Sequence, residues 1–444
     1  MPSPKERSTR VWNILLVILL LCAGGEFILR GPLRFVHAST FNDYIPPYVQ
    51  TRAWMQGEDP YSPQNLLRFW PPEANRVDFL SRVRPDDSLI FNWGIPTAYP
   101  LPTFALTAPL AALPWPIAQP VWLVITVLSF AVTVTSMMSF ANLLPWTRSG
   151  LVFLAISLAL APFHTALAAG SIVSVAVAAS AAAVWADSRK HEILAGLLLA
   201  AAVSLKPQIG LPFCFYYLVR RRWRIPAVAG GIVAILSTVA AVRLAMSGTV
   251  WLQSYLNDNR VLFARGSLGD FTEGNPIRFG LINSQVAAYA LLHNRDAANL
   301  AAFALAAFAG LAWILLLGKT RRDDLALSTL VVLSFMPVYH RFYDATLLVF
   351  PLAWSLTAWK GQFRAMARAV FVVIIAVFLV PGGSALEQLQ RAGQFGALRN
   401  YWLWNALVLP HESWSILILA LLLLRAMHVS AVVQVPDDPA GRLS

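Results

Sequence analysis

Apolar runs recur along almost the whole chain, and this feature constrains the fold more than any other. The runs are continuous rather than alternating, so they predict helices and exclude a β-barrel. Hydrophobic residues make up 57% of the 444 positions and charged residues only 13%, which is far from the composition of a soluble domain. The sequence therefore predicts an all-α, polytopic integral membrane protein that forms a single transmembrane domain over residues 1–444.

Basic residues set the expected orientation. Lys5, Arg7 and Arg10 precede the first apolar run, which is typical of an uncleaved signal anchor that begins in the cytosol. A cleaved signal peptide is the alternative. Further short basic loops lie at 188–191, 220–224, 319–322 and 360–368. If all of them are cytosolic, each pair of neighbouring basic loops must be separated by an even number of spans.

An assignment of twelve spans satisfies this rule and places both termini in the cytosol. The spans lie near 11–29, 120–143, 150–163, 171–186, 192–204, 208–219, 225–246, 298–317, 325–338, 345–359, 368–381 and 412–428. Segments 101–115 and 281–293 are then expected to be re-entrant or surface helices on the outer side. Nearly all of the net charge of +12 falls in the cytosolic parts. The basic composition is therefore interpreted as an orientation signal, and no nucleic-acid partner is expected.

The long polar loops, 30–119, 247–297 and 382–411, all fall on the outer side in this topology. A channel or carrier would instead place ionisable groups near mid-membrane, in two matching halves. Polar loops on one face favour an enzyme that works at the outer leaflet.

Asp43 is the first candidate for chemistry because it stands among aromatic residues just after the first span. A carboxylate held there could act as a general base, although Asn-Asp also commonly caps a helix. Asp59 and Tyr61 follow in an Asp-Pro-Tyr sequence, which is more typical of a turn and is a secondary candidate for substrate contact.

Lys206 lies between two apolar spans, ahead of Pro207 and with Gln208 beside it as a further substrate-binding candidate. Its ammonium could hold a phosphate at head-group level, or it could simply reach toward lipid phosphates. His340 and Asp344 are spaced so that a helix would bring them together. This pair could contact substrate or merely orient a span.

Asn283 and Gln285 form a polar patch at the start of an apolar helix, a pattern more often found in caps than in ligand sites. No cluster of acids or histidines has diagnostic metal-ligand spacing, so no metal site is predicted. Cys22 and Cys214 both lie in apolar runs and predict neither a disulfide nor a metal site. Tryptophans of the outer loops are expected mainly as interface anchors: Trp54, Trp70, Trp93, Trp402, Trp404 and Trp414.

Four blocks of the chain resemble the polyprenyl-phosphate-sugar-dependent glycosyltransferases of the GT-C fold, and most closely glycosyltransferase family 87. This family includes polyprenyl-phosphomannose-dependent α-1,2-mannosyltransferases. The blocks, in the family's order, are Asp43-Tyr44 with Gly57 to Tyr61, Leu194 to Arg224 through Lys206-Pro207, Asn283-Ser284-Gln285, and Tyr339-His340 with Tyr343-Asp344 and Pro351. Gly170-Ser171 departs from the family's usual Gly-Gln or Gly-Asn. Tyr99-Pro100-Leu101-Pro102 matches its Tyr-Pro-Pro only loosely.

The resemblance implies an inverting transfer of a hexosyl unit, with mannose favoured by family membership. Asp43 would deprotonate the acceptor hydroxyl, and Lys206, with Arg52 or His340, would stabilise the departing phosphate. The partners would be a polyprenyl-phosphate sugar donor, a lipid or glycan acceptor and membrane lipids. No cofactor is expected, since a lipid-linked donor requires no nucleotide site.

The resemblance also implies a bacterial inner membrane protein with its active site on the periplasmic or extracellular side. Two other functions stay open. One is a transporter or flippase for lipid-linked sugars, which would move substrate without covalent transfer. The other is a relative of the same fold that acts as an oligosaccharide ligase or a lipid A-modifying transferase.

Overall fold

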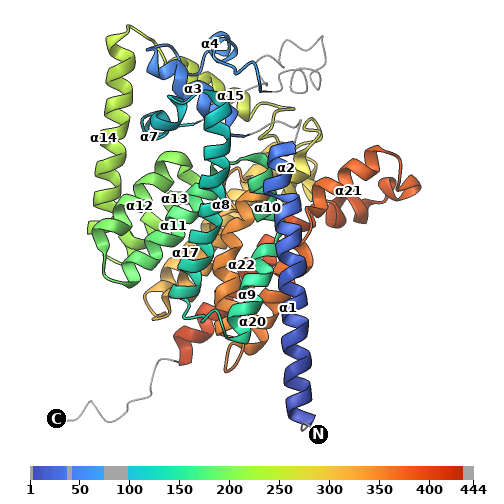
Figure 1. The fold of residues 1–444 in the computed structure, drawn as a ribbon. Coiled ribbons are helices and arrows are strands. Elements are labelled where there is room, and N and C mark those ends of the chain that lie inside the picture. The colour runs from blue at the N-terminus through green and yellow to red at the C-terminus, as the bar shows by residue number, and fades with distance from the viewer. Residues whose placement is uncertain (1–3, 38–42, 75–98, 434–444) are drawn as a thin grey trace, which may run out of the picture.

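The computed structural model describes residues 4–37, 43–74 and 99–433 (Figure 1). The predicted outer loop 30–119 is therefore described only over 30–37, 43–74 and 99–119, and Trp93 lies outside the described residues. The described residues form helices and no strand, apart from a single bridge between Leu281 and Arg341. Helices satisfy their backbone hydrogen bonds internally, which is what apolar surroundings require.

The helices follow one another in an order that agrees with the apolar runs. The α-helices are α1 (Pro4–Arg30), α2 (Pro32–His37), α3 (Ile45–Met55), α4 (Pro63–Arg68), α7 (Leu101–Ala111), α8 (Trp115–Phe140), α9 (Arg148–Ala159), α10 (Ala161–Ala169), α11 (Val173–Ser188), α12 (Glu192–Leu205), α13 (Pro207–Val219), α14 (Arg224–Met246), α15 (Leu252–Leu262), α16 (Ser284–Leu292), α17 (Arg295–Leu317), α18 (Asp323–Ser334), α19 (Val349–Thr357), α20 (Arg364–Phe378), α21 (Gly382–Arg391) and α22 (His411–Val433). Shorter helical turns are η1 (Arg278–Gly280), η2 (Phe342–Leu348), η3 (Gly396–Asn400) and η4 (Trp404–Val408).

A helix occupies each of the twelve predicted ranges, but only some of these helices are long enough to cross a membrane alone. Within the described residues, six helical segments have the necessary length and apolar composition, or seven if the pair α9 and α10, bent by 44°, counts as one span. The short helices α11, α12, α13, α18 and α19, together with the bent pair α9 and α10, account for the difference. The chain is a helical membrane protein, and the count of twelve crossings stays a prediction.

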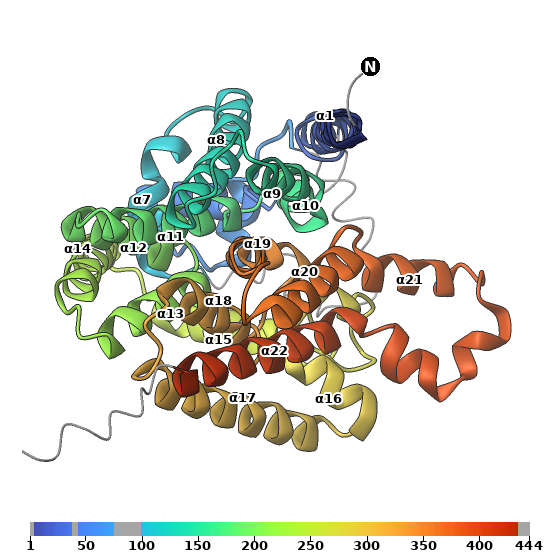
Figure 2. The ribbon, with the colours of Figure 1, turned by 90° about the horizontal axis from the view of Figure 1, so that it is seen from below.

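The buried and peripheral helices differ in how they meet their surroundings. Figure 2 shows α19 in the middle of the bundle, with α1, α14 and α17 at its edge. Almost every residue of α19 is buried, whereas α17 exposes large apolar side chains such as Leu300 and Phe308. Outward-facing apolar residues of this kind are suited to contact with lipid.

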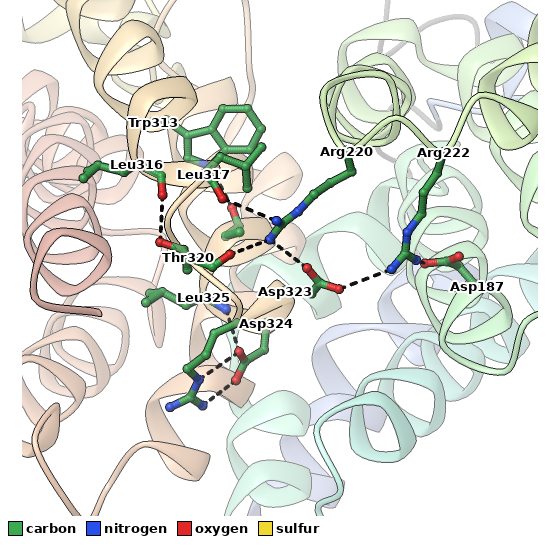
Figure 3. Close-up of polar contacts among 12 residues, drawn as sticks. Asp187, Arg220, Arg222, Trp313, Leu316, Leu317, Thr320, Asp323, Asp324 and Leu325 are labelled. Atoms are coloured by element: carbon green, nitrogen blue, oxygen red, sulfur yellow. Dashed lines mark hydrogen bonds and ion pairs between the residues drawn. The ribbon is translucent and has the colours of Figure 1, made fainter. Parts of the chain in front are cut away.

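Polar contacts join three of the predicted basic loops, as Figure 3 shows for Arg220, Arg222 and Asp323. Arg222 pairs with Asp187 and lies 3.7 Å from Asp323. Arg220 donates to Asp323 at 2.9 Å and to the carbonyl of Thr320 at 2.9 Å. The loops after α11, α13 and α17 are thereby joined at what we term the basic end.

The fourth basic loop belongs to the basic end as well, since the Arg322 guanidinium lies 5.5 Å from the centre of the Phe363 ring. The structure therefore places all four of these loops together. Which side of the membrane they face stays a prediction.

Three short helices lead from the basic end to the opposite, polar end. Helices α12, α13 and α18 have 14, 13 and 12 residues, or about 20 Å at the usual rise per residue. Helix α14 also starts at the basic end but has 23 residues, so it extends farther. Helix α3 packs against its far part, where Trp54 donates to the carbonyl of Ala240 at 3.0 Å. The polar residues at the ends of the short helices therefore lie recessed below α3.

Candidate active site

Asp344 is the centre of a buried polar cluster at this recessed end. It is fully buried, and the Lys206 ammonium donates to its Oδ1 atom at 2.6 Å. The other oxygen accepts from the backbone N–H of Arg341 at 3.0 Å and lies 3.0 Å from His340 Nδ1. His340 and Asp344 are therefore in contact, but not through a helix as predicted, since His340 precedes the short helical turn η2, which begins at Phe342. Their role in substrate binding stays a prediction.

Lys206 reaches this cluster because the chain breaks between two helices. Its backbone is extended (φ −152°, ψ 92°), and Pro207 opens α13 directly after it. Proline fits the first turn of a helix but prevents α12 from continuing. The side chain therefore leaves the helix axis, stays only 8% exposed as a residue, and places its ammonium 5.2 Å from the centre of the Tyr343 ring.

The charge state of Asp344 follows from these contacts. Burial alone would raise the pKa of its carboxyl, but Lys206 and His340 together hold that pKa below its usual range. Asp344 is therefore ionised at neutral pH. A buried ion pair supported by additional hydrogen bonds fixes the position of both partners.

Asp43 approaches the same cluster from the segment between α2 and α3. Its backbone N–H donates to the carbonyl of Ala169 at 2.6 Å, at the point where α10 ends in the left-handed residue Gly170 (φ +64°). Trp122 donates to the Gly170 carbonyl at 2.7 Å and stacks on Tyr44 with 4.2 Å between ring centres. These contacts thus hold the backbone of Asp43 and the ring of Tyr44 that follows it.

The electrostatics of Asp43 differ from those of Asp344. Burial raises the pKa of the Asp43 carboxyl above its ordinary value, although the charges of Arg341 and Lys206 and a hydrogen bond with Tyr343 act against this rise. Among the ion pairs of the described residues, none includes Asp43 or Arg341. The cluster therefore holds one carboxylate that is neutralised by a direct partner and a second one that is not.

Arg341 is the cation of the cluster that forms no ion pair among the described residues. Its Nε atom donates to the Tyr339 hydroxyl at 2.7 Å, and the residue stays partly exposed. Two positive groups, Lys206 and Arg341, thus face two negative ones in a recessed space. An arrangement of this kind can bind an anionic group and accept a proton at Asp43.

Asp59 and Tyr61 lie next to this cluster rather than in it. The Tyr61 backbone N–H donates to Asp59 Oδ1 at 2.9 Å, which is the predicted turn. The Tyr61 hydroxyl donates to the carbonyl of Tyr99 at 2.8 Å. The charges of Asp43 and Asp344 act on the phenol of Tyr99. Tyr61 and Tyr99 therefore connect the turn to the buried cluster.

The remaining predicted residues have local structural partners. Arg52 donates to the Tyr48 hydroxyl at 2.7 Å, on the same face of α3. Asn283 caps α16 by accepting from the backbone of Val286 at 3.2 Å. Gln285 donates to Asn299 at 2.8 Å and so ties α16 to α17. Gln208 lies partly exposed in the first turn of α13.

Sequence reasoning did not predict Arg341 as a site residue, and it named Tyr343 only as part of the block that carries the family resemblance. The available signal for Arg341 was its basic side chain in a segment that was expected on the outer side. Within the described residues, no group of three or more His, Cys, Asp or Glu side chains is placed to hold a metal ion.

Comparison with known protein families gives a match. The family model described as Glycosyltransferase family 87 matches residues 97–339, which is more than half of the chain. No curated protein and no solved structure matches. The matched range includes Lys206 and ends just before His340.

Proposed function

The chain belongs to glycosyltransferase family 87, and from this premise we propose that it transfers a hexosyl unit from a polyprenyl-phosphate-linked donor to an acceptor hydroxyl. Family membership favours mannose as the hexose and a lipid- or glycan-linked acceptor. The observation that carries the proposal is a desolvated carboxylate without a direct cationic partner, Asp43, placed beside Arg341 and the Lys206–Asp344 pair.

The proposed reaction is a single displacement at the anomeric carbon. Asp43 takes the proton of the acceptor hydroxyl as its oxygen attacks that carbon. The bond between the anomeric carbon and the phosphate oxygen breaks, and the polyprenyl phosphate leaves with the electron pair. Attack from the opposite side inverts the configuration. The proton on Asp43 then returns to solvent.

The charges of the cluster suit this sequence of events. Apart from His340, the two carboxylates and the two cations sum to zero before reaction. When Asp43 becomes protonated, the cluster gains one net positive charge, at the moment when negative charge develops on the leaving phosphate. Groups that are already positioned for a developing charge stabilise the transition state most. Arg341 has donors left for two phosphate oxygens, and Lys206 keeps two donors beyond its bond to Asp344.

The recessed position of the cluster fits a donor that stays in the membrane. The short helices place the cluster about 20 Å from the basic end, which is less than the hydrocarbon thickness of roughly 30 Å. A cytosolic basic end would then put the reaction at the outer face of the membrane, with the donor phosphate slightly below the surface. Both termini would be cytosolic, as the basic loops predict.

The test is a transfer assay with purified protein in liposomes. Polyprenyl-phosphate mannose, glucose and galactose, each radiolabelled in the sugar, are supplied with membrane glycolipid extracts as acceptors, and nucleotide sugars are supplied in parallel. Label should pass from one of the lipid-phosphate donors to a new product, with free polyprenyl phosphate formed in equal amount. Movement of intact donor across the bilayer without product would establish the transporter alternative. Transfer from a nucleotide sugar alone would refute the proposed donor.

A further inference from the structure

A second acidic site lies beside Tyr61, outside the cluster that carries the proposed chemistry. Asp59, after α3, and Asp258, on α15, are close enough for the charge of Asp59 to act on Asp258. The Asp59 carboxylate accepts from the Tyr61 backbone at 2.9 Å and from the Ser254 side chain. Asp59 therefore has partners that hold it in place.

Asp258 lacks such partners. The residue is only 9% exposed, and its Oδ2 atom is buried without a hydrogen-bond partner among the described residues. Burial, together with the charge of Asp59, raises the pKa of Asp258 to about 7. A buried carboxylate oxygen without a donor destabilises a fold, so it calls for a ligand that supplies one.

Aromatic rings border the two acids. The ring of Tyr61 lies 5.1 Å from Tyr255 and 6.5 Å from Trp251, measured between centres. Tyr255 belongs to α15 and Trp251 directly precedes it, and both are partly exposed. Carboxylates that accept from hydroxyl groups and aromatic rings that cover apolar C–H faces suit a neutral sugar. Two carboxylates side by side repel a phosphate, so they disfavour the lipid-phosphate end of the donor.

The position of this site relates it to the proposed chemistry. On one side, Tyr61 contacts the residues that surround Asp59 and Asp258. On the other side, its hydroxyl makes the 2.8 Å bond to the carbonyl of Tyr99, which borders the Asp43 cluster. A sugar held at Asp59 and Asp258 would therefore lie on the approach to Asp43, separated from it by these two tyrosines.

We infer that Asp59, Asp258, Tyr255 and Trp251 form a binding subsite for a neutral sugar residue of the acceptor. This inference rests on the proposed transfer function only in assigning the bound sugar to the acceptor. Binding of a neutral sugar at these residues can be measured whether or not transfer occurs.

The experiment uses saturation-transfer difference NMR on the full chain in detergent, with methyl α-mannoside, methyl α-glucoside and methyl α-galactoside as probes. At least one glycoside should give a saturable signal with the wild-type protein. Asp258→Leu should weaken its binding about tenfold or more, because it removes a charge-assisted acceptor. Asn257→Leu, at an exposed position of the same helix, is the matched control and should leave binding unchanged.

Two further measurements distinguish a role of Asp258 in sugar binding from a purely structural role. Asp258→Leu should raise the melting temperature, since it removes an unpartnered buried carboxylate, and it should leave binding of polyprenyl phosphate unchanged. The inference is overturned if no glycoside binds, if Asp258→Leu binds the glycoside like the wild type, or if it loses glycoside and polyprenyl phosphate together. Glycoside binding without any transfer would instead contradict the proposed function while supporting the subsite.

Discussion

The Lys206–Asp344 pair allows a prediction whose size follows from its surroundings. The two side chains are 10% and 0% exposed, and the Nζ and Oδ1 atoms are 2.6 Å apart. Removing one partner of a buried pair costs about 3–5 kcal/mol. In Lys206→Met, Asp344 would keep the backbone N–H of Arg341 and its contact with His340. We therefore expect the lower end of this range, a loss of about 3 kcal/mol in the free energy of unfolding.

A double-mutant cycle separates the pair from its neighbours. Asp344→Asn combined with Lys206→Met should cost less than the sum of the single changes, with a coupling free energy of about 1–3 kcal/mol. The assay is reversible unfolding in mixed micelles with increasing SDS, followed by circular dichroism. Lys319→Met, at an exposed position of the basic end, is the control. A loss below about 1 kcal/mol for Lys206→Met, with additive single effects, would refute the reasoning from burial and geometry.

Two further predictions concern electrostatics and helix packing. Protonated Asp43 cannot accept a proton, so activity should fall as the pH drops through the pKa of Asp43, which burial raises and Arg341 lowers. Arg341→Met should therefore shift the acidic limb of the kcat/KM profile to higher pH, and Arg341→Lys should shift it less. An acidic limb that does not move in Arg341→Met would contradict the assigned electrostatics. A Cβ atom at Gly196 would lie 2.9 Å from the carbonyl oxygen of Ile225 on α14, so Gly196→Ala should lower the melting temperature. Gly230→Ala, where a Cβ atom has open space, should not, and equal melting temperatures for the two variants would refute close packing of α12 on α14.

Local patterns in the sequence were sufficient to predict the helices and parts of the site. Continuous apolar runs placed a helix in each of the twelve ranges. His340 and Asp344 are in contact as expected, although through the segment before η2 rather than along a helix. The basic loops, interpreted as an orientation signal, do meet at one end through Arg222, Asp187 and Asp323. The apolar runs and the basic loops depend on helix periodicity and on charge, which a sequence displays directly.

Contacts between distant segments could not be predicted in the same way. Lys206 and Asp344 are separated by 138 positions, and nothing in either segment specifies the other. Helix length alone does not decide which helices cross, because α12 and α13, with 14 and 13 residues, are shorter than the roughly 20 residues that a crossing requires. The proximity of Asp59 and Asp258 arises from the way α15 packs beside Tyr61, which is a property of the tertiary fold.

The central claim is that Asp43 is the base in a glycosyl transfer from a lipid-phosphate donor. The most direct measurement is the single-turnover rate of Asp43→Asn with the labelled donor that the wild type uses, alongside Glu58→Gln as a control at a nearby, partly exposed acid. General-base catalysis contributes about 10²- to 10⁴-fold, so we expect a loss of that size while polyprenyl-phosphate binding and the melting temperature stay near those of the wild type. A rate close to that of the wild type would contradict the account.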